Sequence, residues 1–166
     1  MSLTGQVGSR INLEHVNALD LGNAKYKPLI NAIVNFASGT GAGQANSVFT
    51  DTRTLTASGT ENLDLSGGLT DAFGNTLAFT RVKAILVVAR SANTNDVEVT
   101  RPASNGVPLF LSAGDGVTIP PDGQFFLVAP DADGIAVTAS TGDIITITNS
   151  AGGSSVTYDI VIVGTV

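Results

Sequence analysis

Few residues of this chain have the types and spacing that chemistry requires. His15 is the only histidine, and no Ser or Asp pattern surrounds it, as a nucleophilic or metal site would need. The 166 residues contain no cysteine, which removes thiolate nucleophiles, thiolate metal ligands and disulfides. We interpret His15 as a surface or interface residue.

Acidic turns are the next candidates. Asp131 and Asp133 stand two residues apart before Gly134, like the first half of a calcium-binding loop. An EF-hand loop continues with a third oxygen ligand and a bidentate Glu, whereas this sequence continues with the strand-like segment 135–138. We interpret these residues as an Asp-Gly turn, with a loop calcium site as the alternative.

The other acids of the second half are also compatible with turn chemistry. Spacing alone does not exclude a carboxylate pair for glycoside hydrolysis. However, all six acids after Pro102 except Asp159 lie in or beside a Gly-containing turn. The chain is only 5% aromatic and has no Trp, so the stacking platform that sugar-binding sites favour is missing. We therefore predict no enzyme, no catalytic residues, no cofactor and no metal.

A glycine-rich loop, Ser38–Gly43, suggests nucleotide binding at first sight. Gly39, Gly41 and Gly43 match the start of a dinucleotide-binding fingerprint. The fingerprint then needs a small residue where this chain has Gln44 or Asn46, and a helix must follow. Neither condition is met, so the segment is interpreted as a flexible loop.

The charge content of the chain indicates which partners it can have. Charged residues make up 13% of the chain and apolar residues 43%, which favours burial against other subunits because a monomer usually needs more charge to stay soluble. The net charge of −6 arises after Arg101, where six acids and no base follow. We expect neither nucleic acid nor membrane as a partner, since an acidic surface repels both.

The elements that must position these residues are strands. The longest strand signal is Leu77–Arg90, apolar on both sides from Ala84 to Ala89. Alternation through it places Thr80, Val82, Ala84 and Leu86 on one side, and we predict that Leu86 and Val88 point into the core. Val48–Ala57 alternates with Thr50, Thr52, Thr54 and Thr56 on one half-exposed face.

Short strands at regular intervals complete the pattern. Turn residues separate a short strand at 61–65 and seven predicted strands after Arg90, at 96–101, 108–112, 116–119, 124–129, 134–139, 143–149 and 155–163. Such a rhythm is typical of an all-β sandwich or barrel. We predict a jelly-roll-like β-sandwich, and a Greek-key sandwich stays open as the alternative.

The first 28 residues break this pattern. They mix polar residues, carry Arg10, Lys25 and Lys27, and end at Pro28. We predict a short irregular arm at 1–28, with at most two helical turns, and a sandwich domain at 29–166 whose first strand is Leu29–Phe36. Such an arm suits contact with a neighbouring subunit or a larger surface.

One family resemblance is visible in four segments. These are Leu63–Ile85, the Pro-Asp-Gly-Gln-Phe-Phe-Leu run at 121–127, Gly142–Ile147, and Val156–Gly164. Together they resemble a family of small virion proteins of tailed bacteriophages, over roughly residues 48–166. The resemblance implies a β-sandwich structural protein of the phage particle and no catalytic residues.

The function expected from this resemblance is capsid decoration. A decoration, or cement, protein would be made in the host cytoplasm, since no signal peptide is visible, and would bind the outer capsid surface as a homotrimer. It would bridge subunits of the major capsid protein. The alternatives are a tail, baseplate or head-fibre component, a carbohydrate- or calcium-binding adhesin module, and a hydrolase.

Overall fold

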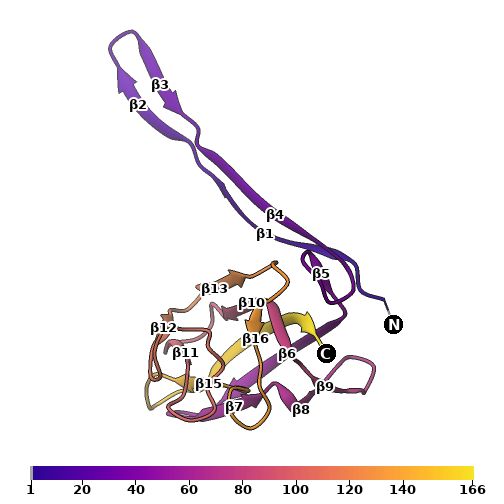
Figure 1. Cartoon of the computed structure of the whole chain (residues 1–166). Coiled ribbons are helices and arrows are strands. Elements are labelled where there is room, and N and C mark those ends of the chain that lie inside the picture. Colours follow the sequence, from indigo (N-terminus) through magenta and orange to yellow (C-terminus); the bar gives the residue numbers. More distant parts are fainter. Residues whose placement is uncertain (1) are drawn as a thin grey trace.

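The computed structural model describes residues 2–166, which form sixteen strands and no helix (Figure 1). No helix that could cross a membrane is therefore present in this part of the chain. The N-terminal strands and a short strand after them are β1 (Gly5–Asn12), β2 (His15–Leu19), β3 (Gly22–Tyr26), β4 (Leu29–Ser38) and β5 (Gln44–Ala45). The body contains β6 (Ser47–Leu55), β7 (Thr60–Asp64), β8 (Ser66–Thr70), β9 (Thr76–Ala78), β10 (Arg81–Ala89), β11 (Val97–Thr100), β12 (Gly116–Ile119), β13 (Gln124–Val128), β14 (Ile135–Ala136), β15 (Ile144–Asn149) and β16 (Val156–Thr165).

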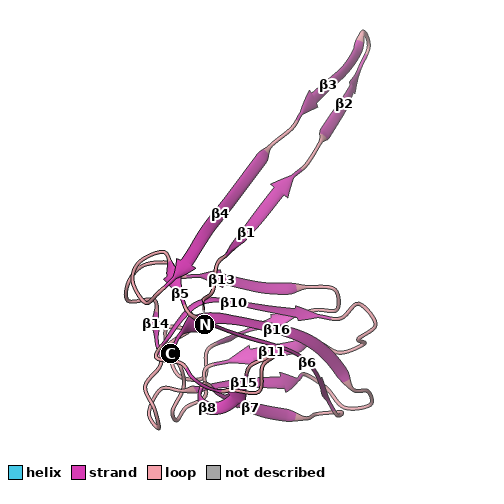
Figure 2. Cartoon of the chain, turned by 90° about the vertical axis from the view of Figure 1, so that its right-hand side faces the viewer, coloured by secondary structure: helices cyan, strands magenta, loops and turns pink. Residues whose placement is uncertain are grey.

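Two sheets of the body pack face to face (Figure 2). One has the order β13-β10-β16-β6, with β14 beside β10, and the other has the order β12-β11-β15-β7. Apolar side chains between them form one core, in which β10, β16, β11 and β15 contribute Ile85, Val87, Ile160, Ile162, Val97, Val99, Ile145 and Ile147. The predicted all-β, sandwich-like body is therefore confirmed.

Strand pairing in this body is nested. The first long strand, β6, pairs with the last, β16; β7 pairs with β15, β10 with β13, and β11 with β12, all antiparallel. The first four of these strands therefore pair with the last four in reverse order. The C-terminal strand, β16, lies between β10 and β6, inside the sheet nearest the N-terminal strands.

A register shift in β10 overturns the predicted orientation of its side chains. Val82 is paired with Gly164 and Ala84 with Val163, so Lys83 is an extra residue, as in a β-bulge. The bulge reverses the alternation: Val82, Ile85 and Val87 enter the core, whereas Leu86 and Val88 are half-buried on the outer face. The prediction that Leu86 and Val88 point inward is therefore wrong, because strict alternation does not hold across a bulge.

The N-terminal segment is a regular hairpin. β1 pairs with β4 and β2 pairs with β3 in one continuous antiparallel register, closed by a two-residue turn at Asp20 and Leu21. The predicted irregular arm with helical turns is wrong, because this segment satisfies its backbone hydrogen bonds through strands. Leu29–Ser38 is the return strand of the hairpin, so a domain boundary at Leu29 would separate two paired strands.

Three smaller differences concern the body. Pro108–Ser112 is a loop, whose carbonyl oxygens at Phe110 and Leu111 accept hydrogen bonds from the Arg101 guanidinium at 2.9 and 3.1 Å. The strand predicted from Leu77 to Arg90 is interrupted between β9 and β10. A small hairpin, β8 with β9, occupies the predicted turn-rich connection. The Thr50, Thr52, Thr54 and Thr56 side of β6 is exposed, as predicted.

Candidate functional site: a projecting hairpin and the groove beneath it

The N-terminal hairpin projects far beyond the sandwich (Figure 1). Every cross-strand pair in it joins residues whose numbers add up to 41, from Gly5 with Phe36 to Leu19 with Gly22. The register continues between the strands, since the Leu13 amide donates to the Pro28 carbonyl at 3.2 Å. Facing residues of an antiparallel pair lie on the same side of the hairpin. Each pair therefore belongs to one of two faces that run along the whole length of the hairpin.

We call these the apolar face and the charged face. The apolar face contains no Asp, Glu, Lys or Arg, and its large side chains are Val7, Ile11, Leu13, Leu19, Tyr26, Ile30, Val34 and Phe36. The charged face holds all five charged residues of the hairpin, Arg10, Glu14, Asp20, Lys25 and Lys27. The hairpin is therefore amphipathic although it covers no core along most of its length.

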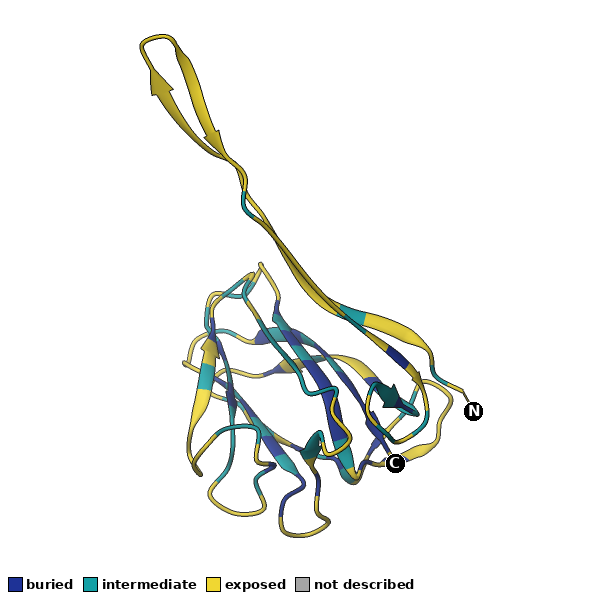
Figure 3. Cartoon of the chain, turned by 45° about the horizontal axis from the view of Figure 1, so that its top comes forward, coloured by how far each residue is buried: buried dark blue, intermediate teal, exposed yellow. Residues whose placement is uncertain are grey.

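Its apolar side chains are largely exposed (Figure 3). Among residues 2–166, nine of the twelve exposed large hydrophobic side chains belong to the hairpin, at Ile11, Leu13, Val16, Leu19, Leu21, Tyr26, Leu29, Ile30 and Ile33. The exposed fractions of Leu13, Tyr26 and Ile30 are 60%, 68% and 61%. Five of the nine, Ile11, Leu13, Leu19, Tyr26 and Ile30, lie on the apolar face, and an exposed apolar surface of this kind marks an interaction site.

The root of the hairpin is anchored to the sandwich. Phe36 is buried against Ala84 and Val163 on the outer face of the sheet, and Val7 and Val34 pack against the same cluster. The loop that follows β4 is tied down as well, since the Gly43 amide donates to the Pro130 carbonyl at 2.7 Å. These contacts fix the direction in which the hairpin leaves the body.

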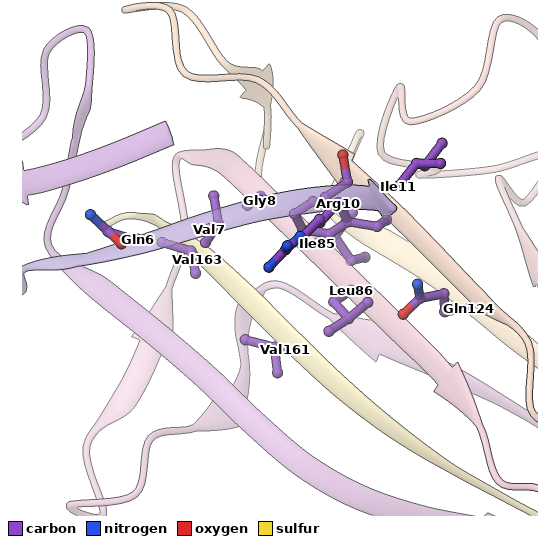
Figure 4. Close-up of a pocket in the computed structure, with 13 residues that line it drawn as sticks. Gln6, Val7, Gly8, Arg10, Ile11, Ile85, Leu86, Gln124, Val161 and Val163 are labelled. Carbon is purple, nitrogen blue, oxygen red and sulfur yellow. The ribbon is translucent and has the colours of Figure 1, made fainter. Parts of the chain in front are cut away.

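A groove of about 450 Å³ lies between β1 and the outer sheet (Figure 4). Residues 6–11 of β1 line one side, and Leu86, Phe126 and Val161 line the other. These three are neighbours across β13, β10 and β16, and each is half-buried. The groove is therefore bordered by apolar side chains that only part of the hairpin covers.

Charge is distributed unequally between hairpin and body. The hairpin has three bases and two acids, a net charge of +1, and the remaining residues have five bases and twelve acids, a net charge of −7. The Glu14 carboxylate forms ion pairs with the Lys27 ammonium at 2.5 Å and the Lys25 ammonium at 3.0 Å. These two ammonium groups lower the pKa of Glu14.

The residues considered for chemistry in the sequence are not brought together. His15 is exposed on the apolar face of the hairpin, opposite Tyr26. Gly39 and Gly41 belong to a loop that closes on itself, where the Gly41 amide donates to the Gln44 side chain at 2.8 Å. In the described residues, 2–166, no three His, Asp or Glu side chains are grouped as a metal site would require.

The acidic turn at Asp131 is stabilised by a cation of the chain itself. The Asp131 carboxylate accepts a hydrogen bond from the Gly134 amide at 2.6 Å, as expected for an Asp-Gly turn. The buried ammonium of Lys83 donates to the carbonyl oxygens of Asp131 and Ala132, the latter at 2.9 Å. Burial lowers the pKa of Lys83. The bulge in β10 thus directs Lys83 to the turn.

A polar cluster around the buried Tyr158 links the two sheets, and no sequence pattern indicates it. The Tyr158 hydroxyl in β16 donates to Glu61 in β7 at 2.7 Å, and Arg53 in β6 donates to the other oxygen of Glu61 at 2.6 Å. Burial and this hydrogen bond raise the pKa of Tyr158. The cluster joins β6 and β16 of one sheet to β7 of the other.

The comparisons with known proteins do not identify a relative. No protein-family model, no curated protein and no solved structure matches the chain. The hairpin and the groove are therefore the features from which a function can be proposed. The short polar–apolar alternation from Arg10 to Glu14 is the sequence signal for a strand in this segment, and His15–Ala18 interrupts it.

Proposed function

We propose that this chain is a non-enzymatic structural protein of a tailed-phage virion, a capsid decoration protein that binds the outer capsid surface as a homotrimer. The observation that carries this proposal is the anchored amphipathic hairpin, whose apolar side chains require a partner. The family resemblance of residues 48–166 supplies the virion as the setting. In this proposal the major capsid protein is the second partner, bridged at the joints between its subunits.

We further propose that the body is a jelly roll. If its eight long strands are numbered along the chain, the two sheets run 6-3-8-1 and 5-4-7-2. The nested pairing of first with last strand is what two Greek keys wrapped together produce, an architecture of viral capsid and lectin domains. A rigid body of this kind suits a protein that must resist deformation.

Multivalency explains how such a protein would stabilise a shell. Each subunit makes a modest contact, but linked subunits bind with an effective concentration in the millimolar range. A bound trimer stabilises the assembled shell by mass action, because it binds the intact joint better than the opened one. The low charge of the chain and the exposed threonines of β6 favour such packing.

Gold labelling of virions tests this function. Particles of the phage that encodes the chain would be labelled with an antibody against the sandwich and imaged by negative stain. We expect label over the whole head, and a head that resists heating less well when the gene is deleted. Label confined to the tail or baseplate would favour the tail alternative, and unlabelled particles would contradict a virion role.

Light scattering after size exclusion tests the oligomer separately. A trimer has three times the 16.8 kDa mass of the chain. We expect this mass at micromolar concentration. A monomer mass in both dilute and concentrated samples would contradict the trimer.

A further inference from the structure

We infer that the projecting part of the hairpin, from Ile11 to Ile30, binds a second copy of this chain, on the sheet row formed by Phe126, Leu86 and Val161. The apolar face of one hairpin would fill the groove beneath the hairpin of the next copy. This inference rests on the proposed function and adds the partner surface and the residues that meet.

The apolar face of the hairpin already packs on the sheet within each chain. At the root of the hairpin, Val7, Val34 and Phe36 of the apolar face pack on the outer sheet around Ala84 and Val163. Farther out, the same face presents Ile11, Leu13 and Ile30, whose exposed fractions are 51%, 60% and 61%. On the sheet, the next row along the strands is also apolar and half-covered (Figure 4).

The exposed part of the apolar face and the apolar row on the sheet are therefore both uncovered. They resemble in chemistry the two surfaces that already pack together at the root of the hairpin. In a single chain they are separated by the groove. In a second copy the same two surfaces are available, so that a ring of copies covers every hairpin and every groove once. A repeated contact of this kind closes when the rotation between neighbours is that of a cyclic oligomer.

Area supports a partner of this size. The apolar face has five exposed large side chains, Ile11, Leu13, Leu19, Tyr26 and Ile30. They offer on the order of 300 Å² of apolar surface, from the transfer energies of such side chains and about 25 cal/mol per Å². A standard interface buries about 800 Å² per partner, of which a little more than half is apolar. The apolar face of one hairpin thus supplies roughly two-thirds of the apolar area of one standard interface.

Charge and reach favour a copy of this chain as the occupant. The hairpin is the only part of the chain with a net positive charge in this division, +1 against −7 for the rest, so each hairpin is attracted to the body of another copy. From Ile11 to Leu21 the hairpin extends for about 30 Å at roughly 3.3 Å per residue. That overhang exceeds the width of a four-stranded sheet, about 15 to 20 Å at 4.8 Å per strand, and reaches a neighbour.

Disulfide trapping between two distinguishable full-length chains tests the inference. The natural chain has no cysteine, so each variant carries a single one. A tagged chain with Ile30→Cys, on the apolar face of the hairpin, is coexpressed with an untagged chain with Gln124→Cys, an exposed position that lines the groove. The matched control is Asn31→Cys, the exposed neighbour of Ile30 on the charged face.

We expect a disulfide between tagged and untagged chains for Ile30→Cys, on the order of tenfold more than for Asn31→Cys, because a disulfide needs Cα atoms within about 7 Å. Equal trapping for the two variants would overturn the inference, and so would the absence of trapping. The virion labelling would still decide the proposed function in either case.

Discussion

At the scale of single residues, the buried hydroxyl of Tyr158 is the most consequential polar group of the core. It donates to Glu61 at 2.7 Å, and Glu61 also accepts from Arg53. Tyr158→Phe would leave one carboxylate oxygen of Glu61 without this donor. We expect the free energy of unfolding to fall by about 1 to 3 kcal/mol, measured by urea denaturation.

The chain contains its own control for this change. Its only other tyrosine, Tyr26, is 68% exposed on the hairpin, so Tyr26→Phe should change the free energy of unfolding by less than about 0.5 kcal/mol. Similar losses for the two variants would mean that the cluster around Glu61 contributes nothing specific.

Asp159 gives a pH dependence with a defined sign. Its carboxylate accepts a hydrogen bond from the Thr52 hydroxyl at 2.6 Å and forms an ion pair with the Arg90 guanidinium at 2.7 Å. Both interactions lower the pKa of Asp159. A carboxyl with a lowered folded-state pKa contributes stability above its unfolded pKa, about 3.9, and loses it as the pH falls through the folded value.

Asp159→Asn should therefore cost less than about 1 kcal/mol at pH 7, as expected for a partly exposed pair. The difference from the natural chain should shrink as the pH is lowered below about 4. Denaturation at pH 3, 5 and 7 measures it. A difference of the same size at pH 3 and pH 7 would show that the charge of Asp159 is not the cause.

At the scale of elements, the bulge in β10 decides which side chains form the core. Ile85 is fully buried between the sheets, and its neighbour Leu86 is half-buried on the outer face. Ile85→Ala should cost about 2 to 5 kcal/mol through lost transfer energy and the cavity. Leu86→Ala should cost clearly less in the isolated chain. A larger loss for Leu86→Ala in denaturant melts would contradict the register of β10.

The two faces of the hairpin predict opposite tolerance to charge. Ile30→Asp places a carboxylate on the apolar face, where an interface would have to desolvate it. We expect self-association to weaken by at least about tenfold, which corresponds to 1.4 kcal/mol. Analytical ultracentrifugation measures this change.

Asn31→Asp, one residue away on the charged face, is the matched control. It should leave the association constant nearly unchanged. Both variants should melt like the natural chain at concentrations where that chain is monomeric, because neither residue contacts the core. Equal weakening by the two variants would argue that net charge, and not the apolar face, controls assembly.

At the scale of the whole molecule, folding and assembly should be separable. The outer half of the hairpin, residues 13–28, contacts no part of the sandwich core. Replacing it by Asn-Gly would close the hairpin directly after the facing pair Asn12 and Leu29, since this dipeptide forms the tight turn that two paired strands need.

The shortened chain should keep a β-type circular dichroism spectrum and cooperative melting, while losing its oligomer and its binding to undecorated capsids. Size exclusion with light scattering and a capsid-binding assay measure the two losses. A shortened chain that binds as tightly as the natural one would make the hairpin tip a bystander. Failure to fold would show that the outer half supports the sandwich.

The sequence by itself determined the class of the body. Alternation in Val48–Ala57, the apolar run at Ala84–Ala89 and turn residues at short intervals are local features, and strands, turns and the exposed threonine side of β6 depend on such local patterns. The same local logic indicated that Asp131 and Gly134 form a turn and that the glycines after Ser38 form a loop.

Only the tertiary structure decided the faces of β10 and the nature of the N-terminal segment. One extra residue at Lys83 reverses the alternation after it, and the Lys83 ammonium donates hydrogen bonds to carbonyl oxygens 48 and 49 residues away. Pairing of Gly5 with Phe36 and of His15 with Tyr26 is equally non-local. Sequence patterns report which side chains alternate, but cross-strand hydrogen bonds between distant residues decide which strand they alternate against, and thus which face stays uncovered.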